Sequence, residues 1–126
     1  MAGAGLMGHG IAQVHAAVGK AVTLYEPDPA RAEAGRARIA ANLERAVAKG
    51  RIHAADREAI LARISVTSGR AAAVDADLVV EAVFEDEAVK TALWAALDAI
   101  APPAAVFATN TSSISIDRLA AALSEA

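Results

Sequence analysis

The chain has no cysteine, 3% aromatic residues and no long apolar run. Without cysteine it can form no disulfide, thiolate metal site or cysteine nucleophile. No stretch approaches the roughly 18 apolar residues that a membrane span requires. No basic region followed by a hydrophobic stretch opens the chain, so a signal peptide is not predicted. We therefore expect a cytoplasmic protein with no membrane partner.

The net charge of the chain is also small. The formal net charge is −3, which gives no general attraction to nucleic acid or to an anionic membrane. Any anion that binds must therefore be held locally. The 126 residues suffice for one domain, residues 1–126, and 56% of them are hydrophobic. With so few aromatic residues, we expect a closely packed core of alanine, valine, leucine and isoleucine.

A glycine motif lies almost at the start of the chain. It consists of Gly3, Ala4, Gly5, Leu6, Met7 and Gly8, a G-x-G-x-x-G run. The first glycine permits a tight strand-to-helix turn, the second lets the backbone approach a pyrophosphate, and the third allows close helix packing. Phosphates then bind at the N–H groups and the positive end of the helix. The motif predicts a dinucleotide cofactor.

The residues that follow the motif support this prediction. Apolar residues at helical spacing lead to Gly19 and Lys20, a helix stop, and then to a strand at 21–25 that ends in Glu26. This is a β-α-β pattern with an acid where a ribose would lie. A carboxylate accepts from free hydroxyls and repels a 2′-phosphate, so Glu26 favours NAD over NADP. A glycine turn without a ligand is the alternative.

The first strand is short. Only Met1 and Ala2 precede Gly3, whereas a strand usually has about five or six residues. The strand that leads into this turn lies in the middle of such a sheet. We therefore expect that the first strand is clipped at its N-terminus.

A helical hairpin is predicted between the second and third strands. Its first helix begins with Asp28 as the N-cap and Pro29 at the first position, and it runs to about Lys49, where Gly50 stops it. A shorter helix at about 55–63 follows. One helix would suffice to connect the two strands, so the hairpin adds a surface, and that surface has a basic edge.

The rest of the chain alternates strands and helices. We predict strands at 64–67, 78–83 and 105–109, a helix at about 86–100 and a last helix near Asp117. The apolar run 78–83 fits a strand buried on both faces, interrupted by Glu81. This order indicates an α/β fold of Rossmann type, a doubly wound parallel sheet. Ligands of such sheets bind at the carboxyl ends of the strands, so the glycine motif, Glu26, 83–85 and 110–113 should converge.

Several polar residues at this edge have two possible roles. Asn110, Thr111, Ser112 and Ser113 either cap the last helix or offer a hydroxyl to a nicotinamide or a substrate oxygen. Glu85 and Lys90 either form an exposed helix start or face the crevice. The three histidines do not share metal-ligand spacing, and none is placed as a general base for alcohol oxidation. No metal site is predicted.

Three separated stretches in the same order resemble one family. They are residues 3–13, residues 77–90 and residues 108–113. They are similar to the NAD-binding domain of the L-3-hydroxyacyl-CoA dehydrogenases, over essentially the whole chain. That family interconverts 3-hydroxyacyl-CoA and 3-oxoacyl-CoA with NAD, in β-oxidation of fatty acids, in butyrate or polyhydroxyalkanoate metabolism and in aromatic-acid catabolism.

The resemblance implies roles for individual residues. Glu26 would hold the adenosine ribose, and Glu85 and Lys90 the ribose on the nicotinamide side. Ser112 would be the catalytic serine that reaches both the nicotinamide and the 3-oxygen of the substrate. The other implied cofactor residues are Ala82 and Asn110, in addition to the glycine motif. The hairpin would lie against the CoA moiety, so the implied substrate contacts are Asn42, Lys49 and Ser112.

The chain also departs from the family pattern. The catalytic histidine of the family lies in a His-Phe-Phe-Asn-Pro-like segment beyond the serine, whereas this chain ends at Ala126, fourteen residues after Ser112. The all-helical C-terminal domain, through which the family usually forms homodimers, is missing as well. We therefore expect a fragment that at most binds NAD, from a parent enzyme that acts on acyl-CoA. A related sugar-acid dehydrogenase and a stand-alone nucleotide-binding module are the alternatives.

Overall fold

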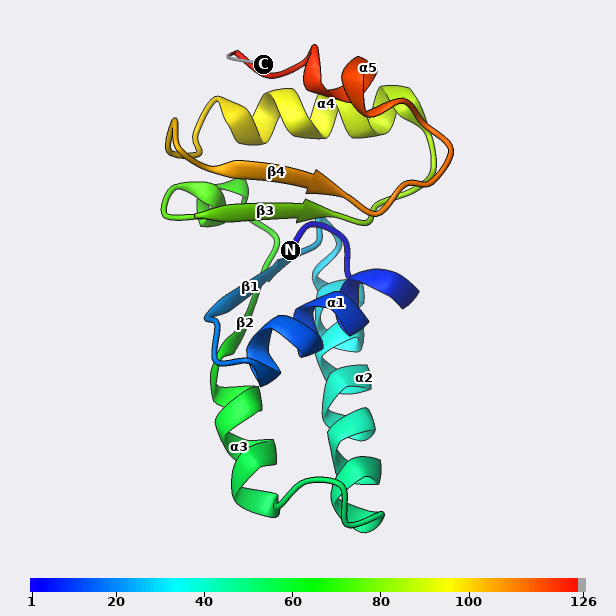
Figure 1. Cartoon of the computed structure of the whole chain (residues 1–126), viewed down its shortest axis with the longest axis vertical. Coiled ribbons are helices and arrows are strands. Elements are labelled where there is room, and N and C mark those ends of the chain that lie inside the picture. Colours follow the sequence, from blue (N-terminus) through cyan, green and yellow to red (C-terminus); the bar gives the residue numbers. More distant parts are fainter. Residues whose placement is uncertain (125–126) are drawn as a thin grey trace.

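Two pairs of parallel strands form the centre of this computed structural model, which describes residues 1–124 (Figure 1). Within each pair the strands run side by side, β1 with β2 and β3 with β4. Ala2 lies between the pairs and forms parallel bridges to Tyr25 and to Glu81. The strands are β1 (Val22–Tyr25), β2 (Ile64–Thr67), β3 (Leu78–Glu81) and β4 (Val106–Thr109). The spatial order is thus β2, β1, the Ala2 segment, β3 and β4.

Helices alternate with these strands along the chain. They are α1 (Leu6–Ala17), α2 (Pro29–Ala48), α3 (Ala54–Ala62), α4 (Glu87–Asp98) and α5 (Ile116–Ala120), with the short 3-10 helix η1 (Arg70–Ala73). The predicted bounds agree to within two residues, and only η1 was not predicted. Among the described residues, no helix combines the length and the apolarity needed to cross a bilayer.

Helices cover both faces of the central sheet. Neighbouring residues of a strand point to opposite faces, and in β1 Leu24 and Tyr25 belong to different clusters. Leu24 packs with residues of α1, α2 and α3, such as Ile39. Tyr25 lies in a cluster with Val79 of β3 and Leu97 of α4. The prediction of a doubly wound α/β fold is therefore confirmed.

The prediction that β3 is buried on both faces is wrong. Leu78 is 40% exposed and Val106, its partner in β4, is 60% exposed. On the covered face, Trp94 of α4 packs against Phe107, with ring centroids 5.6 Å apart. The described helices cover the opposite face less completely, because α1 and α2 pack mainly against β1 and β2.

The helical hairpin follows the sequence signals closely. The Asp28 carboxylate accepts from the N–H groups of Ala30 and Arg31, at 2.9 and 3.3 Å, and Pro29 is the first residue of α2. Gly50 ends that helix with a φ of +66°, a left-handed conformation that favours glycine. The hairpin projects from the sheet, with α2 and α3 side by side (Figure 1).

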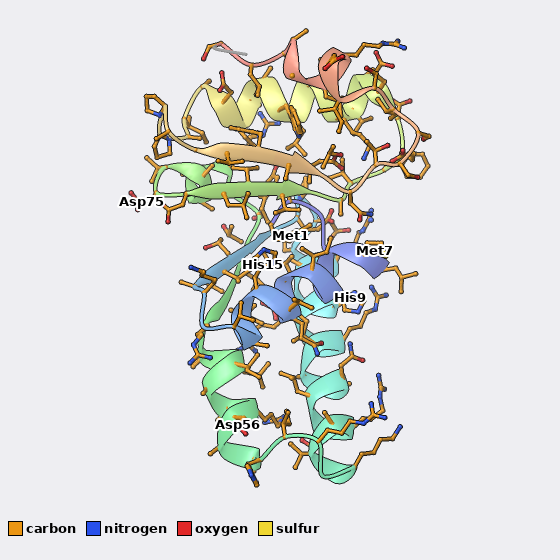
Figure 2. The ribbon with its side chains drawn as sticks, in the orientation of Figure 1. Met1, Met7, His9, His15, Asp56 and Asp75 are labelled. Carbon is orange, nitrogen blue, oxygen red and sulfur yellow. The ribbon has the colours of Figure 1, made fainter. Side chains whose placement is uncertain are left out.

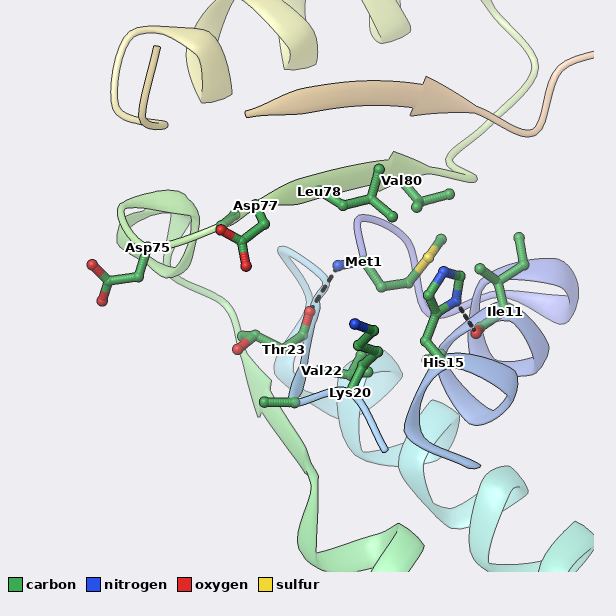
Figure 3. Close-up of a pocket in the computed structure, with 13 residues that line it drawn as sticks. Met1, Ile11, His15, Lys20, Val22, Thr23, Asp75, Asp77, Leu78 and Val80 are labelled. Carbon is green, nitrogen blue, oxygen red and sulfur yellow. Dashed lines mark hydrogen bonds between the residues drawn. The ribbon is translucent and has the colours of Figure 1, made fainter. Parts of the chain in front are cut away.

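A cavity of about 550 Å³ lies between β1, β3 and α1, next to Met1 (Figure 3). Beyond Met1, residues of β1 such as Val22 and of β3 such as Leu78 line the cavity, together with His15 of α1. The terminal amino group of Met1 donates to the carbonyl oxygen of Thr23 at 2.9 Å.

Gly35 allows α2 to approach the glycine turn. A Cβ atom on this residue would lie 2.8 Å from the Cβ of Ala4 and 3.3 Å from a methyl carbon of Leu24. Real Cβ atoms essentially never come within 3.0 Å of another heavy atom, so the contact with Ala4 is the forbidding one. The absence of a side chain at Gly35 therefore sets the distance between α2 and the turn that opens α1.

We expect Gly35→Ala to destabilise the fold by about 1–3 kcal/mol, because overpacking outweighs the gain in helix propensity. Gly10→Ala is the matched control, since a Cβ there meets no heavy atom of the described residues within 4 Å. It should stabilise the chain by about 0.5–1 kcal/mol, as alanine does in helix interiors. Urea unfolding of both variants measures the difference. Equal shifts in the two variants would contradict the close approach.

We expect the stability of the chain to depend on pH, because the terminal amino group of Met1 is buried. Burial lowers the pKa of this amine from 8.0 to about 6. Between these values the unfolded chain binds a proton that the folded chain does not, so the free energy of unfolding rises with pH. The gain from pH 6 to pH 8 should be about 2 kcal/mol. Comparison with the N-terminally acetylated chain isolates this contribution, and identical pH profiles would exclude it.

Candidate cofactor site

The glycine turn depends on two close backbone contacts. Gly3 has a φ of +98°, and a Cβ on it would lie 2.6 Å from the carbonyl oxygen of Ala82. A Cβ on Gly8 would lie 1.8 Å from the carbonyl oxygen of Gly3. Both positions therefore require glycine, the first because of its backbone angle and its contact with the end of β3, and the second because α1 begins directly behind the turn.

Gly5 has a different environment. A Cβ there would meet no heavy atom of the described residues within 4 Å, so this part of the turn is open. Gly5 is the N-cap of α1, and in the described chain no side chain caps the helix there. The first N–H groups of α1 and its positive dipole end are therefore available to an anion. Met7 and His9 mark this end of α1 in Figure 2.

Glu26 lies beside the glycine turn. The residue is 8% exposed, and one of its carboxylate oxygens accepts from the N–H of Ala4 at 3.2 Å. The other oxygen lies 3.9 Å from Nε of Arg31. A cavity of about 620 Å³ opens here, with Gly3, Gly5, Glu26 and Arg31 among the residues that line it. The opposite wall includes Ala82 and Val83, so the cavity spans the carboxyl ends of β1 and β3.

A second polar cluster lies at the ends of β3 and β4. Glu85 accepts hydrogen bonds from the hydroxyls of Thr111 and Ser113, the latter at 2.9 Å. Its other oxygen lies 3.1 Å from the ammonium of Lys90. Lys90 is only 1% exposed, and it also pairs with Glu81 at 2.6 Å. The structure therefore places the ammonium of Lys90 behind Glu85, whose own side chain is about half exposed.

These contacts lower the pKa of Glu85. The hydrogen bond from Thr111 has the largest effect, followed by those from Ser113 and Lys90. Each of them favours the charged carboxylate over the neutral acid. Glu85 is therefore an anion at neutral pH, and the hydrogen bonds that it accepts stabilise this charge.

Asn110 and Ser112 occupy the turn after β4. Their side chains are exposed, and the backbone N–H of Asn110 donates to the carbonyl oxygen of Glu81 at 2.8 Å. This bond ties the turn to the end of β3, next to Ala82. The structure thus brings the glycine motif, Glu26, Glu85 and the 110–113 turn to one edge of the sheet.

Two of the three predicted substrate residues, Asn42 and Lys49, lie away from this edge. Asn42 is in the middle of α2, where its amide donates to the side chain of Gln13 at 3.3 Å and accepts from Arg45. Lys49 is exposed and forms the C-cap of α2. This end of α2 lies at the tip of the hairpin (Figure 1). Only an extended ligand could contact both this tip and the cleft.

Sequence reasoning missed several residues of the site. Glu81 is noted in the sequence only as a charge that interrupts an apolar strand, although a fully buried acid is itself a signal of a specific partner. Thr109, the last residue of β4, donates to it at 2.7 Å. Arg70, at the start of η1, lines the cavity beside Glu26, and no local pattern indicates this position.

These features together define a dinucleotide-binding domain of the α/β class. The sequence of residues 1–126 matches the family described as "3-hydroxyacyl-CoA dehydrogenase, NAD binding domain". The chain therefore belongs to this family.

Curated relatives carry related names. The chain is 48% identical over 121 residues to a 3-hydroxybutyryl-CoA dehydrogenase of Mycobacterium tuberculosis, and the alignment covers 95% of this chain and 42% of that protein. It is 40% identical over 119 residues to a 3-hydroxyadipyl-CoA dehydrogenase of Escherichia coli, and this alignment covers 94% of this chain and 25% of that protein. The chain thus spans less than half the length of these relatives.

Solved structures agree with this assignment. A crystal structure of Mycobacterium tuberculosis FadB2 superposes with a TM-score of 0.96 at 46% identity, covering 98% of this chain and 44% of that one. The (S)-3-hydroxybutyryl-CoA dehydrogenase PaaH1 of Ralstonia eutropha gives a TM-score of 0.94 at 37% identity, with the same coverage.

Removing the two hydroxyls should raise the pKa of Glu85. We expect Thr111→Val combined with Ser113→Ala to move this pKa toward its ordinary value, while the ion pair with Lys90 keeps the return incomplete. Carbon-13 NMR of the side-chain carboxyl group measures the titration. Thr91→Val, on the same helix as Lys90, is the control and should leave the value unchanged. An unaltered pKa in the double variant would mean that the hydroxyls do not bind this carboxylate.

Proposed function

We propose that residues 1–126 form one domain whose cleft binds NAD. The observation that carries this proposal is the hydrogen bond from the N–H of Ala4 to Glu26, because it joins the glycine turn to a carboxylate in one cavity. Glu26 accepts from the adenosine ribose, and the pyrophosphate binds at Gly5, Leu6 and Met7 on the open end of α1. The motif requires Gly3 and Gly8 for its backbone shape.

The second polar cluster would hold the nicotinamide half of the cofactor. Glu85 accepts from the ribose on this side, with Lys90 immediately behind it, and Ala82 and Asn110 border the ring. The fit is chemical as well as geometric, because ribose hydroxyls need acceptors and a pyrophosphate needs donors. Glu26 repels a 2′-phosphate, which favours NAD over NADP.

The activity of the parent protein is proposed from the family. We infer an NAD-dependent oxidoreductase that interconverts 3-hydroxyacyl-CoA and 3-oxoacyl-CoA. NAD, when bound, supplies the hydride acceptor. The hydroxyl of Ser112 donates to the 3-oxygen of the substrate and so stabilises negative charge that develops there. The general base belongs to the part of the parent enzyme outside these residues, so the chain alone binds cofactor without turning over substrate.

The remaining features fit the same assignment. Lys49 binds a phosphate of the CoA moiety by its charge, and Asn42 lies two turns before it on α2, the direction in which a long ligand would extend. The parent is proposed to be a cytoplasmic homodimer of fatty-acid β-oxidation or a related acyl-CoA route.

Cofactor binding provides a direct test. Titration of the chain with NADH, followed by fluorescence, should saturate, and Glu26→Gln should weaken binding about tenfold, as expected for the loss of a charged acceptor. NADPH should bind the original chain less well than NADH. In Glu26→Gln the Kd values for the two cofactors should differ less. Glu33→Gln, exposed on α2, is the control. If Glu26→Gln bound NADH as well as the original chain did, the proposed ribose contact would be wrong.

The role of Ser112 is tested in a longer protein that contains the general base. We expect Ser112→Ala to lower kcat with acetoacetyl-CoA at least tenfold and to leave NADH affinity nearly unchanged, because the hydroxyl acts mainly on developing charge. Ser115→Ala, whose side chain does not cap α5, is the control. An unchanged kcat would exclude this role, and turnover by residues 1–126 alone would refute the assignment of the base to another part of the parent.

A further inference from the structure

Glu81 is the most completely buried acid in the described chain. It is the last residue of β3 and is 0% exposed. One carboxylate oxygen accepts from the ammonium of Lys90 at 2.6 Å and from the N–H of Val83 at 2.7 Å. The other accepts from the hydroxyl of Thr109 at 2.7 Å. Glu81 therefore binds three segments of the site at once: the chain after β3, helix α4 and the end of β4.

One line of contacts runs from Glu81 into the turn that carries Ser112. The Thr109 hydroxyl that donates to Glu81 accepts from the N–H of Thr111 at 3.1 Å. The Thr111 hydroxyl in turn accepts from the N–H groups of Ser113 and Ile114, at 3.3 and 3.2 Å. The backbone on both sides of Ser112 is thus fixed by hydrogen bonds that begin at the buried carboxylate.

A second line of contacts reaches the same turn through α4. Lys90 bridges Glu81 and Glu85, with nitrogen to oxygen distances of 2.6 and 3.1 Å. Glu85 then accepts from the hydroxyls of Thr111 and Ser113. The two lines meet at Thr111 and form a closed ring, so a change at Glu81 affects the turn from both directions.

Stability alone gives little reason for this arrangement. Removing two charges from water costs about as much as their attraction returns, and apolar residues of similar volume often serve a fold equally well. Glu81 does not line the cavity beside the glycine turn. Its contacts instead hold Lys90 and the 110–113 turn together at the carboxyl ends of β3 and β4.

We propose that Glu81 is a positioning residue of the NAD site, which holds Lys90 and the 110–113 turn in the arrangement that the nicotinamide half of the cofactor needs. This inference rests on the proposed function for its consequence, but not for its geometry. Glu81→Gln keeps the shape of the side chain and removes its charge. Among the described residues, Lys90 is then left with Glu85 as its only carboxylate partner. The amide has one acceptor oxygen where the carboxylate has two, so it cannot accept from Lys90 and from Thr109 through separate oxygens.

Two single variants of the chain separate the two lines of contacts. Thr109→Val removes only the hydroxyl, and it should shift the amide resonances of Thr111, Ser113 and Ile114 while leaving the ammonium resonance of Lys90 in place. Glu81→Gln should shift both sets. Each variant should raise the Kd for NADH about fivefold or more, the effect of a displaced hydrogen-bonding group. Because Glu81 and Thr109 share one hydrogen bond, the variant that carries both Glu81→Gln and Thr109→Val should lose less affinity for NADH than the sum of the two single losses.

Glu87→Gln is the matched control, since Glu87 is also on α4 but pairs at the surface with Arg118. It should leave the turn resonances and the Kd for NADH unchanged. If Glu81→Gln fails to fold, Thr109→Val still tests the line of contacts through Thr109. The line through Lys90 is then tested in a variant with both Glu81→Gln and Lys90→Met, which removes one negative and one positive charge together.

The outcomes are distinguishable. Turn resonances that stay in place in the folded variants, or an NADH affinity that stays unchanged although the turn moves, would overturn the positioning role. If the original chain does not bind NADH, the proposed function fails, while the resonances of the turn still decide whether Glu81 sets its geometry.

Discussion

The close passage of the backbone at Ala2 and Gly3 is the constraint on which the rest of the structure depends. Ala2 donates to Val80 of β3 at 2.8 Å and accepts from Ala82 at 2.9 Å, and Gly3 donates to Tyr25 of β1 at 2.8 Å. This segment is the link between the two strand pairs. Because Gly3 turns immediately afterwards with a positive φ, the same short segment both joins the sheet and aims α1 at the cleft. A side chain at this point would separate β3 from the turn, and the two walls of the cleft with it.

Much of this arrangement could be predicted from local sequence signals. The signals for α2 are local, because each affects only the helical turn next to it. Asp28 and Pro29 fix where the helix begins, and Gly50 fixes where it ends. The glycine motif likewise specifies a turn whose geometry is local. The exposure of Leu78 and Val106 could not be predicted, because an apolar strand has the same sequence whether or not another element covers its second face. Gly35 was also missed, since the reason for its lack of a side chain is Ala4, which lies 31 residues earlier in the chain.

The polar site divides in the same way. The strand ends predict which segments meet, because parallel strands place their carboxyl ends at one edge. They do not predict which side chains bond to one another. Glu85 and Lys90 lie five positions apart in the sequence and do meet, yet the shorter ion pair of Lys90 is with Glu81, which the pattern presents only as an interruption. To predict a buried ion pair between a strand and a helix, one must know how closely the two elements pack. The periodicity of the sequence does not give this distance.

The distribution of charge around the glycine turn has its own consequence for the ligand. The open end of α1 offers N–H donors and a positive dipole, and it is flanked by carboxylates on either side, Glu26 next to β1 and Glu85 beyond β3. The cleft therefore presents acceptor, donor and acceptor in that spatial order. A free phosphate would use only the centre, and both carboxylates would repel it, whereas a mononucleotide would leave one carboxylate without a hydroxyl. A molecule with two riboses joined by a pyrophosphate satisfies all three, which is why the acids on this anionic chain favour the binding of a dinucleotide.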